Sequence, residues 1–260
     1  MTLNSKKEEY LIYKLADNMK NCIKIDADLF RKLDVKRGLR NEDGTGVLVG
    51  LTNIGNVVGY ERTENGLKPI EGKLYFRGYE ISDLVHAVLN EQRFGFEEIA
   101  YLLLSGGLPD AEELEQFRHL LVGNMPLMSK TMLNIVELEG TDIMNILARS
   151  VLELYTYDNT PDDISRENLM RQSVELISKF PTIIAYAYNM LRHKTFGRSL
   201  HIRHPKDNYS LAENFLYMLL GNNYTPLDAR TLDLLLILQA EHGGGNNSTF
   251  TVRVTSSTCT

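Results

Sequence analysis

The sequence predicts an all-α, multihelical fold with a short β-hairpin segment ahead of the helices. From residue 82 onward, apolar residues recur at helical spacing, and capping motifs follow one another with only short turns between them. The preceding head is instead rich in Gly and Asn, with β-branched runs between the turn signals Asp43-Gly44 and Asn65-Gly66. We therefore expect a helical extension over residues 1–35, a small β-leaning head over residues 36–80 and a helical body over residues 81–260.

The head and the extension have different local patterns. In the head we expect one or two hairpins between about Gly46 and Tyr75. Neither of the common glycine-rich phosphate-binding patterns occurs there, so the glycines are interpreted as turn residues. Apolar residues from Glu8 to Leu33 have mixed helical spacing and predict one or two helices.

Side chains that can pair with free backbone groups mark where the helices of the body begin and end. Gly106-Gly107 follows one apolar helical run and is expected to end it, as Gly221 is expected to end a later one. Three helices are expected to begin at capping pairs: Asp110 with Glu113, Ser210 with Glu213, and Thr225 with Asp228, the last with Pro226 in its first turn. Helices joined in this way, with no strands between them, predict an all-α body.

Two of the expected helices are unusual. Pro181 stands in the middle of the run 171–194, which predicts a kinked helix or two abutting helices. The run from Ala229 to His242 carries leucine or isoleucine around nearly its whole circumference, which predicts a central buried helix. Three glycines and a segment of Asn, Ser and Thr follow it. Polar groups inside the molecule would need partners from the protein or from a ligand.

Composition and charge exclude several classes of function. The 260 residues have a net charge of −6 and no basic stripe of the kind found in nucleic-acid-binding proteins. The amino terminus lacks the apolar core of a signal peptide, and apolar runs such as Leu234 to Leu238 are too short to cross a bilayer. Cys22 and Cys259 share no metal-ligand or redox spacing. We expect a cytoplasmic protein with reduced thiols that binds neither nucleic acid nor membrane.

One group of residues has a spacing that could ligate a metal. His201 and His204 stand close to Asp207 in the sequence. Pro205 interrupts any helix there, and neighbouring cationic side chains would repel a metal ion, so we expect no metal site. The histidines of ordinary amphipathic runs are expected at the surface: His86, His119 and His193.

Five short motifs occur in the order in which they stand in citrate synthases. They are LYFRGYEISDL (residues 74–84), FEEIAYLLLSGGLPDAEEL (96–114), FPTIIAYAY (180–188), LAENFLYMLLG (211–221) and AEHGGGNNSTF (240–250). By these motifs the chain from about Val47 onward resembles the citrate synthase family. The resemblance implies a mostly helical protein with a large and a small domain, an active site between them, and a homodimer. Residues 81–260 would be the amino-terminal part of the large domain, with the small domain absent.

The resemblance implies the condensation of acetyl-CoA with oxaloacetate to give citrate and CoA. In the family a carboxylate deprotonates the acetyl methyl group, one histidine stabilises the enol and a second polarises the keto group of oxaloacetate. The family's catalytic aspartate and its later His-Gly-x-Ala-Asn segment have no counterpart in this sequence. We therefore expect an amino-terminal portion that holds no catalytic residue and does not turn over alone. We expect no permanently bound cofactor; acetyl-CoA would be a co-substrate, and its binding residues are not identified.

The resemblance also implies the residues that bind substrate. His242 would contact oxaloacetate, and Asn246 and Ser248 would line the site. A histidine that closes a buried helix lies at the negative end of the helix dipole, which favours a protonated form suited to a dicarboxylate. The alternatives are a core histidine bonded to the backbone and, for Ser248, a serine that caps a turn. Arg203 could face an anionic ligand, whereas Arg77 is expected to tie the head to the body.

Two other functions remain open. A 2-methylcitrate synthase would take propionyl-CoA instead, and one methylene in a pocket is worth only about 1–3 kcal/mol, so these residues do not decide. Alternatively, the chain is a non-catalytic helical dimerisation module, which the missing carboxylate and histidine favour.

We further expect apolar surface near Leu232 to Leu238 to be exposed or paired with another chain.

Overall fold

The computed structural model describes residues 52–64, 66–137 and 142–241, together with residues 28, 32, 251, 252 and 255. The strands and helices named below all lie in one compact unit, Leu51–Gly244. Asp28 and Lys32 are helical. Otherwise the helices expected between Glu8 and Leu33, and the turn at Asp43-Gly44, fall outside the described residues. The division of the chain at residues 35 and 80 stays a prediction.

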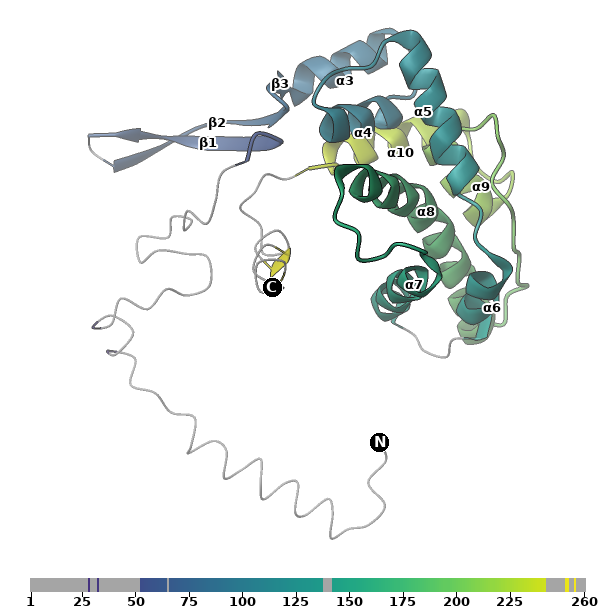
Figure 1. Cartoon of the computed structure of the whole chain (residues 1–260). Coiled ribbons are helices and arrows are strands. Elements are labelled where there is room, and N and C mark those ends of the chain that lie inside the picture. The colour runs from purple at the N-terminus through teal and green to yellow at the C-terminus, as the bar shows by residue number, and fades with distance from the viewer. Residues whose placement is uncertain are drawn as a thin grey trace. The chain divides into compact units, whose positions relative to one another are not determined.

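A β-hairpin precedes the helices, as the sequence predicts. Strands β1 (Gly55–Thr63) and β2 (Gly66–Phe76) pair antiparallel, and the short β3 (Tyr79–Glu80) pairs with the end of β2. Gly66 opens β2 with φ of +109°, a conformation that glycine adopts at little cost, which explains the glycine at this turn. Most hairpin side chains are exposed, and the two strands extend beyond the helices as a ribbon (Figure 1). The base of the hairpin is anchored by Phe76, which is fully buried.

Helices make up most of the remaining described chain. They are α3 (Ile81–Asn90), α4 (Phe96–Ser105), α5 (Ala111–Asn124), α6 (Ser129–Glu137), α7 (Ile143–Tyr157), α8 (Arg166–Phe196), α9 (Leu211–Leu220) and α10 (Pro226–Leu238). Capping boxes at Asp110, Ser210 and Thr225 open α5, α9 and α10. Gly106, with φ of +92°, ends α4, and Gly221 ends α9. These boundaries confirm the helix starts and ends that the sequence predicts.

Helix α8 is the element around which α5, α6, α7 and α9 pack (Figure 1). It is a single helix of 31 residues with Pro181 inside it, so the alternative of two abutting helices is wrong. Proline removes one backbone donor from the helix, at a cost of about 3 kcal/mol or more. Most side chains from Pro181 to Ala187 are buried, and this packing keeps the helix continuous across the proline.

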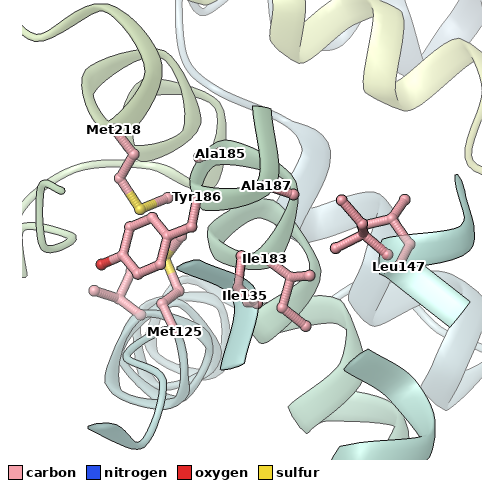
Figure 2. Close-up of a cluster of buried hydrophobic side chains, with 10 residues drawn as sticks. Met125, Ile135, Leu147, Ile183, Ala185, Tyr186, Ala187 and Met218 are labelled. Carbon is pink, nitrogen blue, oxygen red and sulfur yellow. The ribbon is translucent and has the colours of Figure 1, made fainter. Parts of the chain in front are cut away.

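The main hydrophobic core surrounds the middle of α8. The ring of Tyr186 lies between Met125, which follows α5, and Met218 of α9 (Figure 2). Its hydroxyl donates to the Arg203 carbonyl at 3.1 Å, so the polar end of this buried side chain has a partner. Further buried members come from α5, α6, α7 and α8: Val122, Ile135, Ile146, Leu147, Ile183, Ala185 and Ala187.

A second cluster joins the hairpin to three helices. We call it the junction cluster; its buried members are Phe76 of β2, Leu84 and Val88 of α3, Ile99 and Leu102 of α4, and Ile237 of α10. Gly95, just before α4, lies inside this junction. A Cβ atom at position 95 would lie 2.3 Å from Val88 Cγ2 and 3.1 Å from Ile237 Cδ1. The close approach of α3 and α10 to the start of α4 therefore requires glycine at this position.

Helix α10 differs from the central buried helix that its leucines predict. It ends at Leu238 rather than at His242, and its buried residues form one stripe: Ala229, Asp233 and Ile237. Leu227, Leu235 and Leu238 are 72%, 51% and 44% exposed. The prediction of burial on all sides is wrong because α10 packs against α3, α4 and α9 through that single stripe. The expectation of exposed apolar surface near residues 232–238 is confirmed.

Replacing Gly95 with alanine should lower the free energy of unfolding by about 1–3 kcal/mol, because the added Cβ must push α3 away from α4. Gly123→Ala in α5 is the matched control, since nothing lies within 4 Å of a Cβ built there. That change should instead raise stability by up to about 1 kcal/mol. Urea denaturation of both variants and the parent chain measures the difference. Equal effects of the two substitutions would contradict the tight contact at the junction.

Candidate functional site

The residues predicted to bind substrate follow α10 in the sequence. His242, Asn246 and Ser248 lie outside the described residues, so their roles stay predictions. The described chain continues past α10 to Glu241, and the Gln239 amide closes the helix by donating to the Leu235 carbonyl at 3.1 Å. The structure therefore describes the support of the candidate site, namely how α10 and the residues leading to His242 are held.

The first turn of α10 is held by its own residues. The Thr225 hydroxyl accepts the Asp228 amide at 3.2 Å, and Asp228 Oδ2 accepts the Thr225 amide at 2.8 Å. Pro226 occupies the first turn, where its missing donor costs nothing. Local pairing therefore fixes where α10 begins but leaves its orientation to contacts with other helices.

The middle of α10 is held by a buried carboxylate. Asp233 is 1% exposed and lies one turn from Ala229 and from Ile237, which are also buried. Its Oδ2 accepts the Gly95 amide at 2.8 Å, and its Oδ1 accepts the Phe96 amide at 3.1 Å. Gly95 is the N-cap residue of α4 and has no side chain to offer. Asp233 therefore supplies, from another helix, the acceptor that the start of α4 requires.

Opposing influences act on the charge of Asp233. Burial raises the pKa of Asp233 to about 6, and the charge of Glu97 adds to this rise. The two amides at the start of α4 and the guanidinium of Arg118 in α5 lower the pKa but do not cancel the effect of burial. Arg118 also donates from Nη2 to the Phe94 carbonyl at 3.0 Å, so it holds the loop that leads into α4. Asp233 therefore titrates at weakly acidic pH, well above an ordinary aspartate.

A second buried carboxylate also accepts an amide at the start of another helix. Glu97, in the first turn of α4, is 2% exposed, and its Oε1 accepts the amide of Leu211, the first residue of α9, at 2.7 Å. Its Oε2 has no hydrogen-bond partner among the described residues. Asp233 thus caps α4 from α10, and Glu97 caps α9 from α4. Two charge-assisted contacts link the positions of three helices.

The end of α10 and the FRGY motif at the base of the hairpin contribute to the same hydrophobic cluster. Ala240, two residues before His242, packs against the junction cluster, to which Phe76 belongs. The next residue of the motif, Arg77, has φ of +50°, and its guanidinium donates twice to the Leu103 carbonyl of α4, at 2.7 and 3.2 Å. This confirms that Arg77 ties the hairpin to the helical body. Two motifs far apart in the sequence are thus brought to one cluster.

The other residues considered as ligands are exposed or have protein partners. Arg203 donates from Nη1 to the Met218 carbonyl at 3.3 Å, near the end of α9, which gives it a structural contact; binding of an anion by Arg203 stays a prediction. His201 and His204 are exposed, and the described part of the chain holds no group of three or more side chains arranged for a metal. The histidines expected at the surface are exposed, as predicted: His86, His119 and His193.

A hollow of about 460 Å³ lies between α5 and the loop before α9. Its lining carries both signs of charge: Arg118 lies 4.0 Å from Glu115, and Arg93 donates at 2.8 Å to Glu98, which is not part of the lining. Two further carboxylates, Asp207 and Glu213, also line it. Such a lining does not provide the local positive charge that a dicarboxylate requires, so this hollow is not a candidate oxaloacetate site.

Sequence comparison identifies the family. A sequence profile described as "Citrate synthase, C-terminal domain" matches residues 42–260. This chain belongs to the citrate synthase family. It is 37% identical to a citrate synthase of Deinococcus radiodurans over 193 residues, which are 72% of this chain and 49% of that protein. It is 30% identical to 2-methylcitrate synthase 2 of Corynebacterium glutamicum over 237 residues, 86% of this chain and 53% of that protein.

Solved structures agree with the family assignment. The crystal structure of citrate synthase from Pyrobaculum aerophilum matches with a TM-score of 0.68 at 29% identity, over 87% of this chain and 54% of that one. The all-α fold with a small sheet that the sequence predicts is thereby confirmed. This chain spans about half the length of the curated relatives that it matches. None of the described helices combines the length and apolar character needed to cross a membrane.

The sequence analysis did not single out the two carboxylates that hold these helices in place. Asp233 stands inside the otherwise apolar run LDLLLIL (residues 232–238), and Glu97 stands next to Phe96 in the first turn of α4. An acidic residue on the buried stripe of a helix must have donors nearby, because an unpaired buried charge is very costly. That signal was present in the sequence for Asp233, but it did not indicate which amides would pair with it.

The raised pKa of Asp233 predicts how stability depends on pH. An acid whose pKa is higher in the folded state than in the unfolded state stabilises the fold fully below about pH 4, and this contribution is lost as pH rises through about 6. The free energy of unfolding of the parent, relative to Asp233→Asn, should therefore fall by up to about 3 kcal/mol over this range. Denaturation of both proteins at a series of pH values measures it.

Asp228→Asn on the same helix is the control for this experiment. Hydrogen bonds from Thr225 lower the pKa of Asp228, so its stabilising contribution is present above about pH 4 and is lost at lower pH. Its effect should therefore change in the opposite direction. A constant difference between the parent and Asp233→Asn across the pH range would show that Asp233 does not titrate as its surroundings require.

Proposed function

We propose that this chain acts in a cytoplasmic citrate synthase, as the part that binds oxaloacetate, and that the enzyme condenses acetyl-CoA with oxaloacetate to give citrate and CoA. The observation that carries the proposal is the position of the segment AEHGGGNNSTF in the sequence. It begins at Ala240, just after α10, the helix that buried hydrogen bonds hold against α4. The family match over residues 42–260 supports the same function.

The chemistry of the three proposed binding residues suits oxaloacetate. An imidazolium, an amide and a hydroxyl can all donate hydrogen bonds to carboxylate and keto oxygens, and His242, Asn246 and Ser248 supply one of each. Because α10 ends at Leu238 and the effect of a helix dipole falls off within the last turn, the dipole favours protonated His242 less than the sequence suggests. The bound dicarboxylate itself would favour that form.

The acyl group is the second question that the proposal must answer. We propose acetyl-CoA as the co-substrate, because the first of the curated relatives are citrate synthases. The similarity to a 2-methylcitrate synthase keeps propionyl-CoA as the alternative. A single methylene changes affinity by about 1–3 kcal/mol, so parallel assays of the enzyme with the two thioesters discriminate between them.

Self-association is part of the proposal. Helices α6 and α7 pack against each other. Several of their large apolar side chains are exposed: Leu133, Met144, Leu152 and Tyr155. Exposed apolar side chains in such number are a feature of protein interfaces, and a second copy of the chain is the partner that the homodimer of the family requires. A dimer of this kind would also satisfy the alternative of a non-catalytic module, so catalysis and assembly need separate tests.

The parent chain should bind oxaloacetate in isothermal titration, and His242→Ala should weaken binding by about tenfold or more, because a hydrogen bond to a charged group is worth about 1.5–3 kcal/mol. The exposed His204, replaced by alanine in the same way, is the matched control and should leave the affinity unchanged. Equal affinity of the parent and His242→Ala would remove His242 from the site. Absence of binding by the parent would favour the non-catalytic module.

Leu152→Lys should weaken self-association of the chain, because it replaces an exposed apolar side chain of the proposed interface on α7 with a charged one. Leu120→Lys in α5 is the control, since Leu120 is also exposed but lies on another helix. Sedimentation velocity at several concentrations should show a dimer for the parent and the control, and a shift towards monomer for Leu152→Lys. A monomeric parent, or the same behaviour of both variants, would contradict the assignment of the interface.

A further inference from the structure

We propose that Asp233 is a positioning residue, which holds α10 against the start of α4 and thereby sets the point from which the chain enters the segment carrying His242. The inference rests on the proposed role of His242 in binding oxaloacetate, and it adds the residue that holds the base of that segment. Asp233 itself lies in the middle of α10 and is not proposed to touch the substrate.

Two hydrogen bonds from one carboxylate restrict α10 in two ways. Each oxygen of Asp233 accepts one of two consecutive amides, those of Gly95 and Phe96, at 2.8 and 3.1 Å. A shift of α10 along its axis, or a rotation about it, would break at least one of these bonds, because hydrogen bonds weaken steeply with distance and angle. The carboxylate therefore fixes both the height and the rotation of the helix relative to α4.

The contacts continue on the same face of the chain towards His242. Ile237, one turn after Asp233, is a buried member of the junction cluster, and Ala240, three residues later, packs against that cluster. Residues four positions apart lie on one side of a helix, so Ile237 extends the line that Asp233 begins, and Ala240 adds a contact with the same cluster beyond the end of α10. The described chain is thus held against the junction cluster to within two residues of His242.

A carboxylate in this stripe is hard to explain by stability alone. Burying a charged group costs several kcal/mol even when it is paired, and an apolar residue of similar volume often gives an equally or more stable fold. The charged groups acting on Asp233 are Glu97 of α4, which opposes its ionised form, and Arg118 of α5, which favours it. A carboxylate, unlike leucine, makes directional contacts, because its two oxygens must face the amides of Gly95 and Phe96.

The test compares three single variants of the whole 260-residue chain. Asp233→Leu removes both acceptors, Asp233→Asn keeps one of them, and Ile135→Val in the main core is the control for a general loss of stability. Amide hydrogen exchange followed by mass spectrometry reports local opening, and isothermal titration with oxaloacetate reports the site. If Asp233→Leu does not fold, the comparison of Asp233→Asn with Ile135→Val decides the question.

A positioning role predicts local effects. In Asp233→Leu, exchange in the segments 95–99 and 234–241 should rise about tenfold more than in α8, with Asp233→Asn between this variant and the parent. Oxaloacetate affinity should fall about tenfold in Asp233→Leu, partly recover in Asp233→Asn and stay unchanged in Ile135→Val. Two results would overturn the inference. One is a uniform rise in exchange in Asp233→Leu, like that in Ile135→Val. The other is an oxaloacetate affinity of Asp233→Leu equal to that of the parent, where the parent binds. If the parent does not bind oxaloacetate, the proposed function fails, and the exchange pattern alone decides whether Asp233 positions α10.

Discussion

The described fold depends on the pairing of buried carboxylates with the amino-terminal amides of other helices. Asp233 reaches across 138 residues of sequence to Gly95, and Glu97 reaches across 114 residues to Leu211. A buried carboxylate without donors is strongly destabilising, and the first amides of a helix need acceptors, so each contact satisfies two requirements at once. As a consequence α4, α9 and α10 cannot move independently, because a displacement of one leaves a buried charge unpaired in another.

Buried amide side chains extend this network to the long connection between α8 and α9. Asn214 of α9 accepts the Lys206 amide at 2.7 Å and donates to the Lys206 and Tyr209 carbonyls, while Asn189 of α8 donates to the His201 and Met218 carbonyls. These hydrogen bonds fix the position of the connection at the start of α9, where Glu97 accepts the Leu211 amide. This polar path links the core around α8, to which Met218 belongs, with Glu97 at the start of α4.

The sequence predicts local features of the fold well and its long-range contacts poorly. Capping pairs such as Asp110 with Glu113 join residues three positions apart, so the sequence alone shows both partners. The contact of Asp233 with Gly95 joins residues that only the folded chain brings together. Counting leucines likewise predicted a fully buried α10, although the count does not show which face meets a neighbour. The substrate-binding role of His242 was suggested by the family motif and not by any local physical signal.

The two faces of α10 differ in how they fix the helix. Leu235, two residues after Asp233, points about 200° away from it around the helix and is half exposed, so the face opposite the carboxylate contributes little to the position of α10. Apolar contact is non-directional, and a helix held by it alone could slide or turn on its neighbours. The hydrogen bonds of Asp233 have direction, and they form on the side that is already packed. The packed face alone therefore sets the position of α10, and the chain that continues towards His242 starts from that position.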